Sequence, residues 1–150
     1  TDLDEALPRA DIIITVTSAV EAVIEPRHLK PGAVVCDVSR PRDVSVRVAR
    51  ERDDVLVIEG GVVSVPGDVE FHFNFGFPPR TSYACMAETM ILALEGRYES
   101  FSLGKELDLA RVKDIGALAA KHGFTLAGFR SFEKAVTDEQ IARIREKAGR

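Results

Sequence analysis

Three short apolar runs stand out in the first 60 residues, and each is bounded by polar or turn-forming residues. They cover residues 12–16, 33–38 and 55–58. Each run is rich in β-branched residues and apolar at successive positions, which is the pattern of a strand buried on both faces of a parallel sheet. Residues 20–29 and 44–52 predict short, partly helical connections between them. Strands that alternate with helical connections indicate βαβ units.

The period changes to two after residue 69, where phenylalanines alternate with polar residues or glycine up to Pro78. The alternating phenylalanines are Phe71, Phe73, Phe75 and Phe77. This alternation predicts a one-sided strand or extended segment with an aromatic face.

The remaining pattern is helical. Residues 81–95 are apolar nearly all round and predict a buried helix, and residues 108–122 predict an amphipathic one. Thr137 and Gln140 have the spacing of a capping box and open a third helix. At the other end, Thr1 or Asp2 could cap a short first helix.

Taken together, the elements predict an α/β fold: the C-terminal half of a doubly wound parallel sheet with appended C-terminal helices. Because an interior strand comes first, the sheet would be left unfinished, and we expect the chain to be a fragment of a longer protein. The 20 Lys and Arg against 24 Asp and Glu give a net charge of −4, which argues against nucleic-acid binding. Two cysteines exclude a disulfide framework or a four-cysteine zinc site. With no apolar run of about 20 residues and no signal peptide, a cytoplasmic protein without a transmembrane segment is expected.

Several segments in register resemble one family. Residues 10–18 (Ala-Asp-Ile-Ile-Ile-Thr-Val-Thr-Ser), 57–63 and especially 79–90 (Pro-Arg-Thr-Ser-Tyr-Ala-Cys-Met-Ala-Glu-Thr-Met) carry the resemblance, with 100–104 and 121–124 further on. They are similar to the C-terminal portion of the NADPH-dependent long-chain acyl-[acyl-carrier-protein] reductases, which release fatty aldehydes. The resemblance implies that residues 1–80 are the C-terminal half of a Rossmann-like dinucleotide-binding domain. It also implies that residues 81–150 form a helical region.

The chain departs from that family in places. Residues 37–44 look more like glutamyl-tRNA reductases and shikimate dehydrogenase-like proteins, and Leu103 and Met86 stand where the family usually has Trp and Phe. The glycine-rich phosphate turn G-x-G-x-x-G is absent; in the family it lies upstream of the region that matches Thr1.

Cys85 is the first candidate for chemistry. If Thr81 or Ser82 caps the helix, Cys85 falls in the first turn, where unpaired backbone N–H groups and the helix dipole favour a thiolate, and Arg80 is near in sequence. The resemblance places the acyl-accepting cysteine of the reductases on Cys85. The alternative is a cysteine packed as a small hydrophobic residue, which is how we interpret Cys36 in its strand.

Cofactor-binding candidates follow the predicted strands, because dinucleotides lie in the crevice at the carboxyl ends of a doubly wound sheet. They are Thr17, Ser18, Asp37, Gly60 and Gly61. The alternative for each is an ordinary role in a turn or helix cap.

Other candidates are weaker. His72 could protonate a developing alkoxide, although a solvated strand residue is the better interpretation. The phenylalanines could line an acyl slot or simply pack in the core. A cluster of arginines could dock an acidic carrier: Arg40, Arg42, Arg47, Arg50 and Arg52. No motif indicates a metal.

The leading hypothesis is an enzyme that reduces a long-chain acyl thioester, carried by acyl carrier protein or CoA, to an aldehyde through a Cys85 thioester, with NADPH as cofactor. Two alternatives stay open: an NAD(P)-dependent dehydrogenase of a small polar substrate, or a non-catalytic nucleotide-binding domain. Oligomeric state and the choice between NADPH and NADH are open as well.

Overall fold

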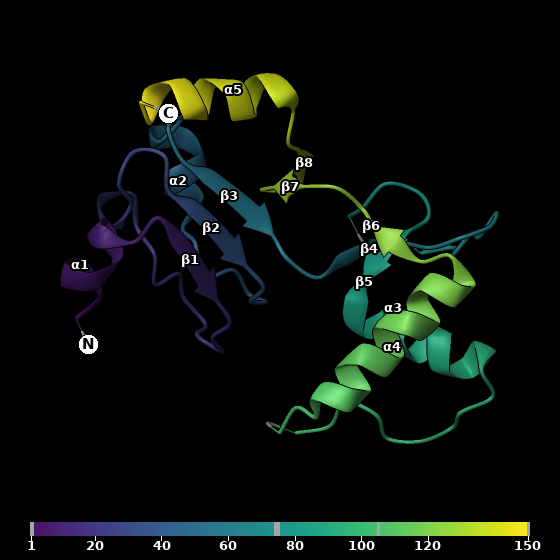
Figure 1. Ribbon diagram of the computed structural model, residues 1–150. Coiled ribbons are helices and arrows are strands. Elements are labelled where there is room, and N and C mark those ends of the chain that lie inside the picture. The colour runs from purple at the N-terminus through teal and green to yellow at the C-terminus, as the bar shows by residue number, and fades with distance from the viewer. Residues whose placement is uncertain (1, 74–75, 105, 150) are drawn as a thin grey trace. The chain divides into compact units, whose positions relative to one another are not determined.

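The computed structural model describes residues 2–73, 76–104 and 106–149 (Figure 1). The chain divides into two compact units. The first unit combines Thr1–Gly60 with Gly128–Arg150, and the second is the intervening segment Gly61–Ala127. The functional division expected at residue 80 is a separate matter and stays a prediction.

A parallel three-stranded sheet forms the centre of the first unit, in the order β1-β2-β3 (Figure 1). Its strands are β1 (Ile12–Thr15), β2 (Val34–Asp37) and β3 (Leu56–Glu59). Ile13, Val35 and Val57 lie side by side in the register of the sheet. The mixed α/β architecture with a parallel sheet is therefore confirmed.

Five helical segments and one hairpin complete this unit. They are α1 (Leu3–Ala6), η1 (Leu7–Arg9), η2 (Pro26–His28), α2 (Val46–Glu51) and α5 (Asp138–Lys147), with the strands β7 (Arg130–Ser131) and β8 (Lys134–Ala135). Asp2 caps α1 by accepting the Asp4 N–H, and Thr137 caps α5 by accepting the Gln140 N–H. Both starts agree with the capping residues expected from sequence; Thr1 lies outside the described residues.

The two faces of the parallel sheet are covered unequally. On one face, Ile13, Val35 and Val57 are buried and pack with Val44 and Val48 in a continuous apolar core. On the other face, Ile12 and Ile14 are 71% and 70% exposed. Near β3 that second face is covered better: Val34 and Leu56 line a hollow together with Ile144 of α5.

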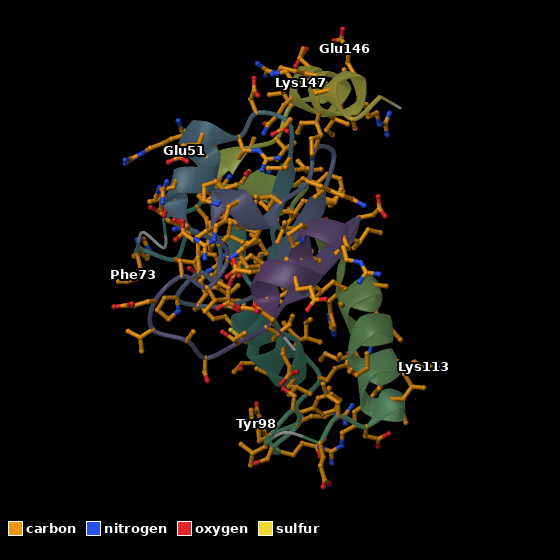
Figure 2. All side chains as sticks on the ribbon, turned by 90° about the vertical axis from the view of Figure 1, so that its left-hand side faces the viewer. Glu51, Phe73, Tyr98, Lys113, Glu146 and Lys147 are labelled. Carbon is orange, nitrogen blue, oxygen red and sulfur yellow. The ribbon has the colours of Figure 1, made fainter. Side chains whose placement is uncertain are left out.

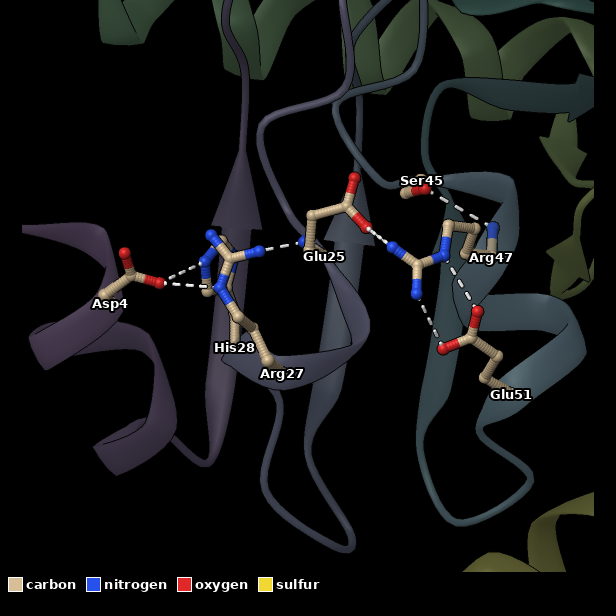
Figure 3. A network of polar contacts seen from close by, with 7 residues as sticks. All are labelled: Asp4, Glu25, Arg27, His28, Ser45, Arg47 and Glu51. Atoms are coloured by element: carbon tan, nitrogen blue, oxygen red, sulfur yellow. Dashed lines mark hydrogen bonds and ion pairs between the residues drawn. The ribbon is translucent and has the colours of Figure 1, made fainter.

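His28 links two of the short helices (Figure 3). Its Nδ1 accepts the Glu25 N–H at 3.0 Å, and its Nε2 lies 2.8 Å from an Asp4 carboxylate oxygen. Since Nδ1 is an acceptor, the geometry assigns the ring proton to Nε2, which donates to Asp4. The 3%-exposed ring therefore ties α1 to η2.

The second unit packs two helices on a small antiparallel sheet of order β5-β4-β6. Its elements are β4 (Val62–Ser64), β5 (Thr81–Tyr83), α3 (Ala84–Leu94), α4 (Leu109–His122) and β6 (Thr125–Leu126). Val65, Ala87, Ile91 and Phe124 form its core. The sequence pattern does not predict this sheet, because strands of two or three residues are too short to show a period.

The prediction of a one-sided strand or extended segment after residue 69 is wrong. Residues 69–73 and 76–80, which the structure describes, contain no strand. His72 and Gly76 have φ values of +52° and +78°, which interrupt an extended chain. Phe73 is 69% exposed and points outward (Figure 2), whereas the Phe77 ring packs edge-on against Tyr83. Phe75 lies outside the described residues.

Among the described residues, no helix combines the length and the apolar character needed to cross a membrane.

Candidate functional site

Cys85 is the second residue of α3 and therefore lies in its first turn. Tyr83 occupies the N-cap position, so the expectation of Thr81 or Ser82 there is wrong. The helix begins later because residues Thr81–Tyr83 pair with β4 instead. The thiol of Cys85 is free and the residue is exposed, whereas Cys36 is half-buried in β2.

Backbone carbonyl groups accept three hydrogen bonds made by residues near Cys85 in sequence. The Thr89 hydroxyl donates to the Cys85 carbonyl at 3.4 Å, and the Ala84 N–H donates to the Gly61 carbonyl at 2.7 Å. Arg80 has a φ of +58° and donates to the Gly67 carbonyl at 3.3 Å. The structure thus keeps Cys85 accessible in the first turn of α3.

The same face of α3 borders an open hollow. Glu88, one turn after Cys85, accepts a hydrogen bond from the Ser102 hydroxyl at 2.6 Å. Glu88 and Ser102 line a hollow of about 440 Å³ whose apolar wall includes Phe101, Leu103 and Val112. Residues three apart on a helix are neighbours, so Cys85 and Glu88 lie on the same side of α3. Cys85 itself does not line this hollow.

A second hollow in this unit contains several of the weaker candidates. It measures about 410 Å³ and is lined in part by Phe71, Phe73, Phe77 and His72. The His72 side chain is 81% exposed, and its Nδ1 lies 3.7 Å from a Glu70 carboxylate oxygen. A ring so exposed has the character of a solvated residue.

Thr17 and Ser18 follow β1 at the carboxyl edge of the parallel sheet, and both are exposed. The Thr17 hydroxyl donates to an Asp43 carboxylate oxygen at 2.5 Å and accepts the Ala19 N–H at 3.1 Å. The Thr17 hydroxyl therefore both donates and accepts a hydrogen bond within the chain, and the Ser18 hydroxyl is the less constrained of the two.

Asp37 ends β2 and is only 1% exposed. Its two carboxylate oxygens accept the N–H groups of Ser39 and Val44, each at 3.0 Å. These bonds give Asp37 the structural role of shaping the turn after β2. A cofactor-binding role for it stays a prediction.

Gly60 is the last residue of the first segment of the first unit, and Gly61 is the first residue of the second unit. A Cβ on Gly60 would come within 2.7 Å of a Val38 methyl group, so the absence of a side chain is needed for packing beside β2. Gly61 has a φ of +73° and open space around it, which is the geometry of a turn glycine. A cofactor-side role for either glycine also stays a prediction.

Asp43 is the residue at this edge that sequence reasoning missed. Its side chain is fully buried and receives hydroxyl hydrogen bonds from Thr15, Thr17 and Ser39. Burial by itself raises the pKa of Asp43, but these bonds outweigh it and lower the pKa from 3.8 to about 2. The only signal in the sequence is the number of hydroxyl residues that follow the first two strands.

The arginine cluster is largely neutralised by ion pairs. Arg42 pairs with Glu59 at 2.9 Å and with Glu133 at 2.8 Å. Arg47 pairs with Glu25 and Glu51 (Figure 3). Arg52 pairs with Asp54 as well. Because three of its five cations already have carboxylate partners, this cluster offers an acidic carrier less charge than the sequence implies.

Within the part of the chain that the structure describes, no group of three or more His, Cys, Asp or Glu side chains is placed to hold a metal ion.

Comparison with models of protein families finds no match. The curated proteins that are similar to the chain include an aminotransferase and a reductase. Aminotransferase PigE of Serratia sp. is 37% identical over 147 residues, which are 96% of this chain and 17% of PigE. Long-chain acyl-[acyl-carrier-protein] reductase of Synechococcus elongatus is 34% identical over 128 residues, 81% of this chain and 37% of that protein. The chain thus spans about a sixth of one relative and little more than a third of the other, and it is related to a reductase-like segment of larger proteins.

Proposed function

We propose that this chain contributes to the NADPH-dependent reduction of a long-chain acyl thioester to a fatty aldehyde, with Cys85 as the acyl-accepting nucleophile. The observation that supports this most is the exposed Cys85 at the start of α3, within a chain similar to a long-chain acyl-[acyl-carrier-protein] reductase. A match covering 81% of 150 residues necessarily includes residue 85. The acyl donor would be acyl carrier protein or CoA.

Cys85 has the position that covalent catalysis needs. Its thiolate sulfur would attack the thioester carbonyl, forming a new S–C bond, while the carrier leaves as a thiolate and takes up a proton. NADPH, when bound, supplies the hydride that converts the acyl group to an aldehyde, and the Cys85 sulfur leaves as a thiolate.

The carboxyl edge of the parallel sheet suits one half of a dinucleotide. Exposed Thr17 and Ser18 follow β1 there, and Gly60 presents no side chain at the end of β3. In doubly wound sheets, nucleotides lie in the crevice at this edge. A Rossmann-like origin of the first unit is thus part of the same proposal.

The similarity to an aminotransferase is compatible with this function. Transamination requires a carbonyl compound as amino acceptor, and thioester reduction produces an aldehyde. A reductase-like segment within an aminotransferase would therefore have a plausible chemical use, and no aminotransferase role is proposed for this chain.

Intact mass spectrometry of the natural full-length polypeptide tests the proposal. After incubation with a long-chain acyl thioester and no NADPH, we expect a single acyl adduct that is absent from Cys85→Ser, retained by Cys36→Ser and discharged as aldehyde by NADPH. Cys36→Ser is the matched control, because it removes the other free thiol of these 150 residues.

If no adduct forms while NADPH still binds, the covalent mechanism is wrong. The small-substrate dehydrogenase or the non-catalytic nucleotide-binding domain would then take its place.

A further inference from the structure

The carboxyl edge of the first unit is organised around one buried carboxylate. The Asp43 side chain accepts hydrogen bonds from the Thr15 hydroxyl, from the Thr17 hydroxyl at 2.5 Å and from the Ser39 hydroxyl at 2.6 Å. The Thr17 N–H donates to it as well, at 3.1 Å. These donors come from the end of β1 and from the turn after β2, which are 22 or more residues apart in sequence.

The same two segments are also joined directly. The Thr17 N–H donates to the Ser39 hydroxyl oxygen at 2.9 Å, and the Ser39 hydroxyl in turn donates a hydrogen bond to Asp43. On the backbone side, the Asp43 carbonyl accepts the N–H groups of Val23 and Ile24. Asp43 therefore contacts three separate segments of the chain.

The donors to Asp43 are neutral hydroxyl and amide groups, in contrast to the arginine that pairs with Glu59, another buried carboxylate at this edge. A buried anion is costly unless its hydrogen-bonding capacity is filled. The lowered pKa of Asp43 agrees with an ionised carboxylate whose hydrogen-bonding capacity is filled by these donors. Such an anion imposes tight geometry on its donors, because moving any one of them leaves charge unsatisfied.

What Asp43 holds in place is the exposed surface of the edge. Thr17 and Ser18 are exposed, whereas Thr15, Ser39 and Asp43 beneath them are buried. We propose that Asp43 is a positioning residue for dinucleotide binding: it fixes the backbone of residues 17–18 against the turn after β2, and so sets the shape of the crevice without touching the ligand. This inference rests on the proposed function only for the place where the cofactor lies.

The test is to measure the Kd for NADPH by fluorescence titration of the natural full-length polypeptide, as wild type and as Asp43→Asn. Asparagine has nearly the same shape, but its NH₂ group cannot accept the hydroxyl and amide donors. We expect the Kd for NADPH to rise about tenfold or more, since hydrogen bonds to a charged group are lost.

Val48→Ala is the control for a merely structural effect. Val48 is 1% exposed in the core of the same unit, and its N–H donates to the Ser45 carbonyl. It is not one of the donors to Asp43, which together with Asp43 form the Asp43 cluster: Thr15, Thr17 and Ser39. If Val48→Ala lowers the melting temperature as much as Asp43→Asn and leaves the Kd unchanged, positioning is supported. An equal rise of Kd in both variants would overturn the proposal.

Thr17→Val adds a second readout, because it removes one donor of the cluster. If Asp43 acts through Thr17, the double variant binds NADPH about as weakly as Asp43→Asn alone. Independent effects, whose fold-changes multiply, would count against the proposal.

The acyl-accepting role of Cys85 and the positioning role of Asp43 can fail separately. A Cys85 adduct together with an unchanged Kd in Asp43→Asn would overturn the positioning role alone. A weakened Kd without any adduct would overturn the covalent mechanism alone. A wild-type protein that binds no NADPH would overturn both.

Discussion

Asp37 and Asp43 are both buried carboxylates near the end of β2, yet they do different work. Asp37 accepts two backbone N–H groups and shapes its own turn. Asp43 gathers hydroxyl groups from two strand ends. In the sequence, Asp37 attracts attention because it ends an apolar run, whereas Asp43 lies in a stretch of arginines and serines with no period. The direction of a side chain in such a turn depends on contacts that are distant in sequence.

The lowered pKa of Asp43 predicts a pH-dependent contribution to stability. Because the folded-state pKa is below the ordinary value, the contribution is present above about pH 4 and is lost as the pH falls toward the folded value of about 2. A shift from 3.8 to about 2 corresponds to about 2 kcal/mol. Urea unfolding of wild type and Asp43→Asn at neutral pH and at about pH 2.5 should show the difference in unfolding free energy shrinking by that order. A difference independent of pH would contradict the ionised state of Asp43.

Gly60 gives a prediction about close packing. A Cβ at this position would lie 2.7 Å from a Val38 methyl group but only in ordinary contact with the Cys36 sulfur, at 3.4 Å. We expect Gly60→Ala to lower the free energy of unfolding by about 1–3 kcal/mol. In a Val38→Ala background the same change should cost at least about 1 kcal/mol less, as a double-mutant cycle by urea unfolding would measure. Equal costs in both backgrounds would show that Val38 is not the obstacle.

At the scale of elements, the structure separates the two faces of β1. Successive residues of a strand point to opposite faces, and here the face with Ile13 is packed while the face with Ile12 and Ile14 is exposed. The apolar run in the sequence predicts burial on both faces, as in a parallel sheet with two covering layers. Within the described part of the chain, α5 provides the second layer, beside Val34 and Leu56.

Alanine substitutions in β1 should follow this alternation. Ile13→Ala removes a buried side chain and should cost about 2–5 kcal/mol of unfolding free energy. The Ile14 side chain is 70% exposed, so Ile14→Ala should change the free energy of unfolding by no more than about 0.5 kcal/mol. Chemical denaturation of the 150-residue chain measures both. A large cost for Ile14→Ala in this chain would mean that another layer, such as a second copy, covers the strand.

At the scale of the whole molecule, two apolar cores account for the division into two units. One core lies around Val35 and Val48, and the other around Ile91 and Phe124. The first unit is discontinuous in sequence, because β7 returns after residue 128 to lie beside β3. Each unit therefore has its own packed interior.

Replacing residues 61–127 by a short Gly/Ser linker tests this division. Because β3 and β7 lie side by side within the first unit, the new linker need span little distance. We expect the shortened chain to unfold cooperatively in urea, with an m-value reduced in proportion to the surface removed. A non-cooperative transition, or loss of secondary structure by circular dichroism, would show that the first core depends on the second unit.

Local signals in the sequence determined the three parallel strands, the starts of α4 and α5 at Asp108 and Thr137, and the place of Cys85 in the first turn of a helix. Apolar period and capping act over only a few residues, so they can be recognised without the rest of the fold. The antiparallel sheet, the later start of α3, the exposed face of β1 and the Asp43 cluster were decided by tertiary structure alone. The antiparallel sheet, the start of α3 and the Asp43 cluster depend on partners about 20 to 60 residues away in sequence. No local pattern records which distant segment a strand or carboxylate will meet, or which face of a strand will be left uncovered.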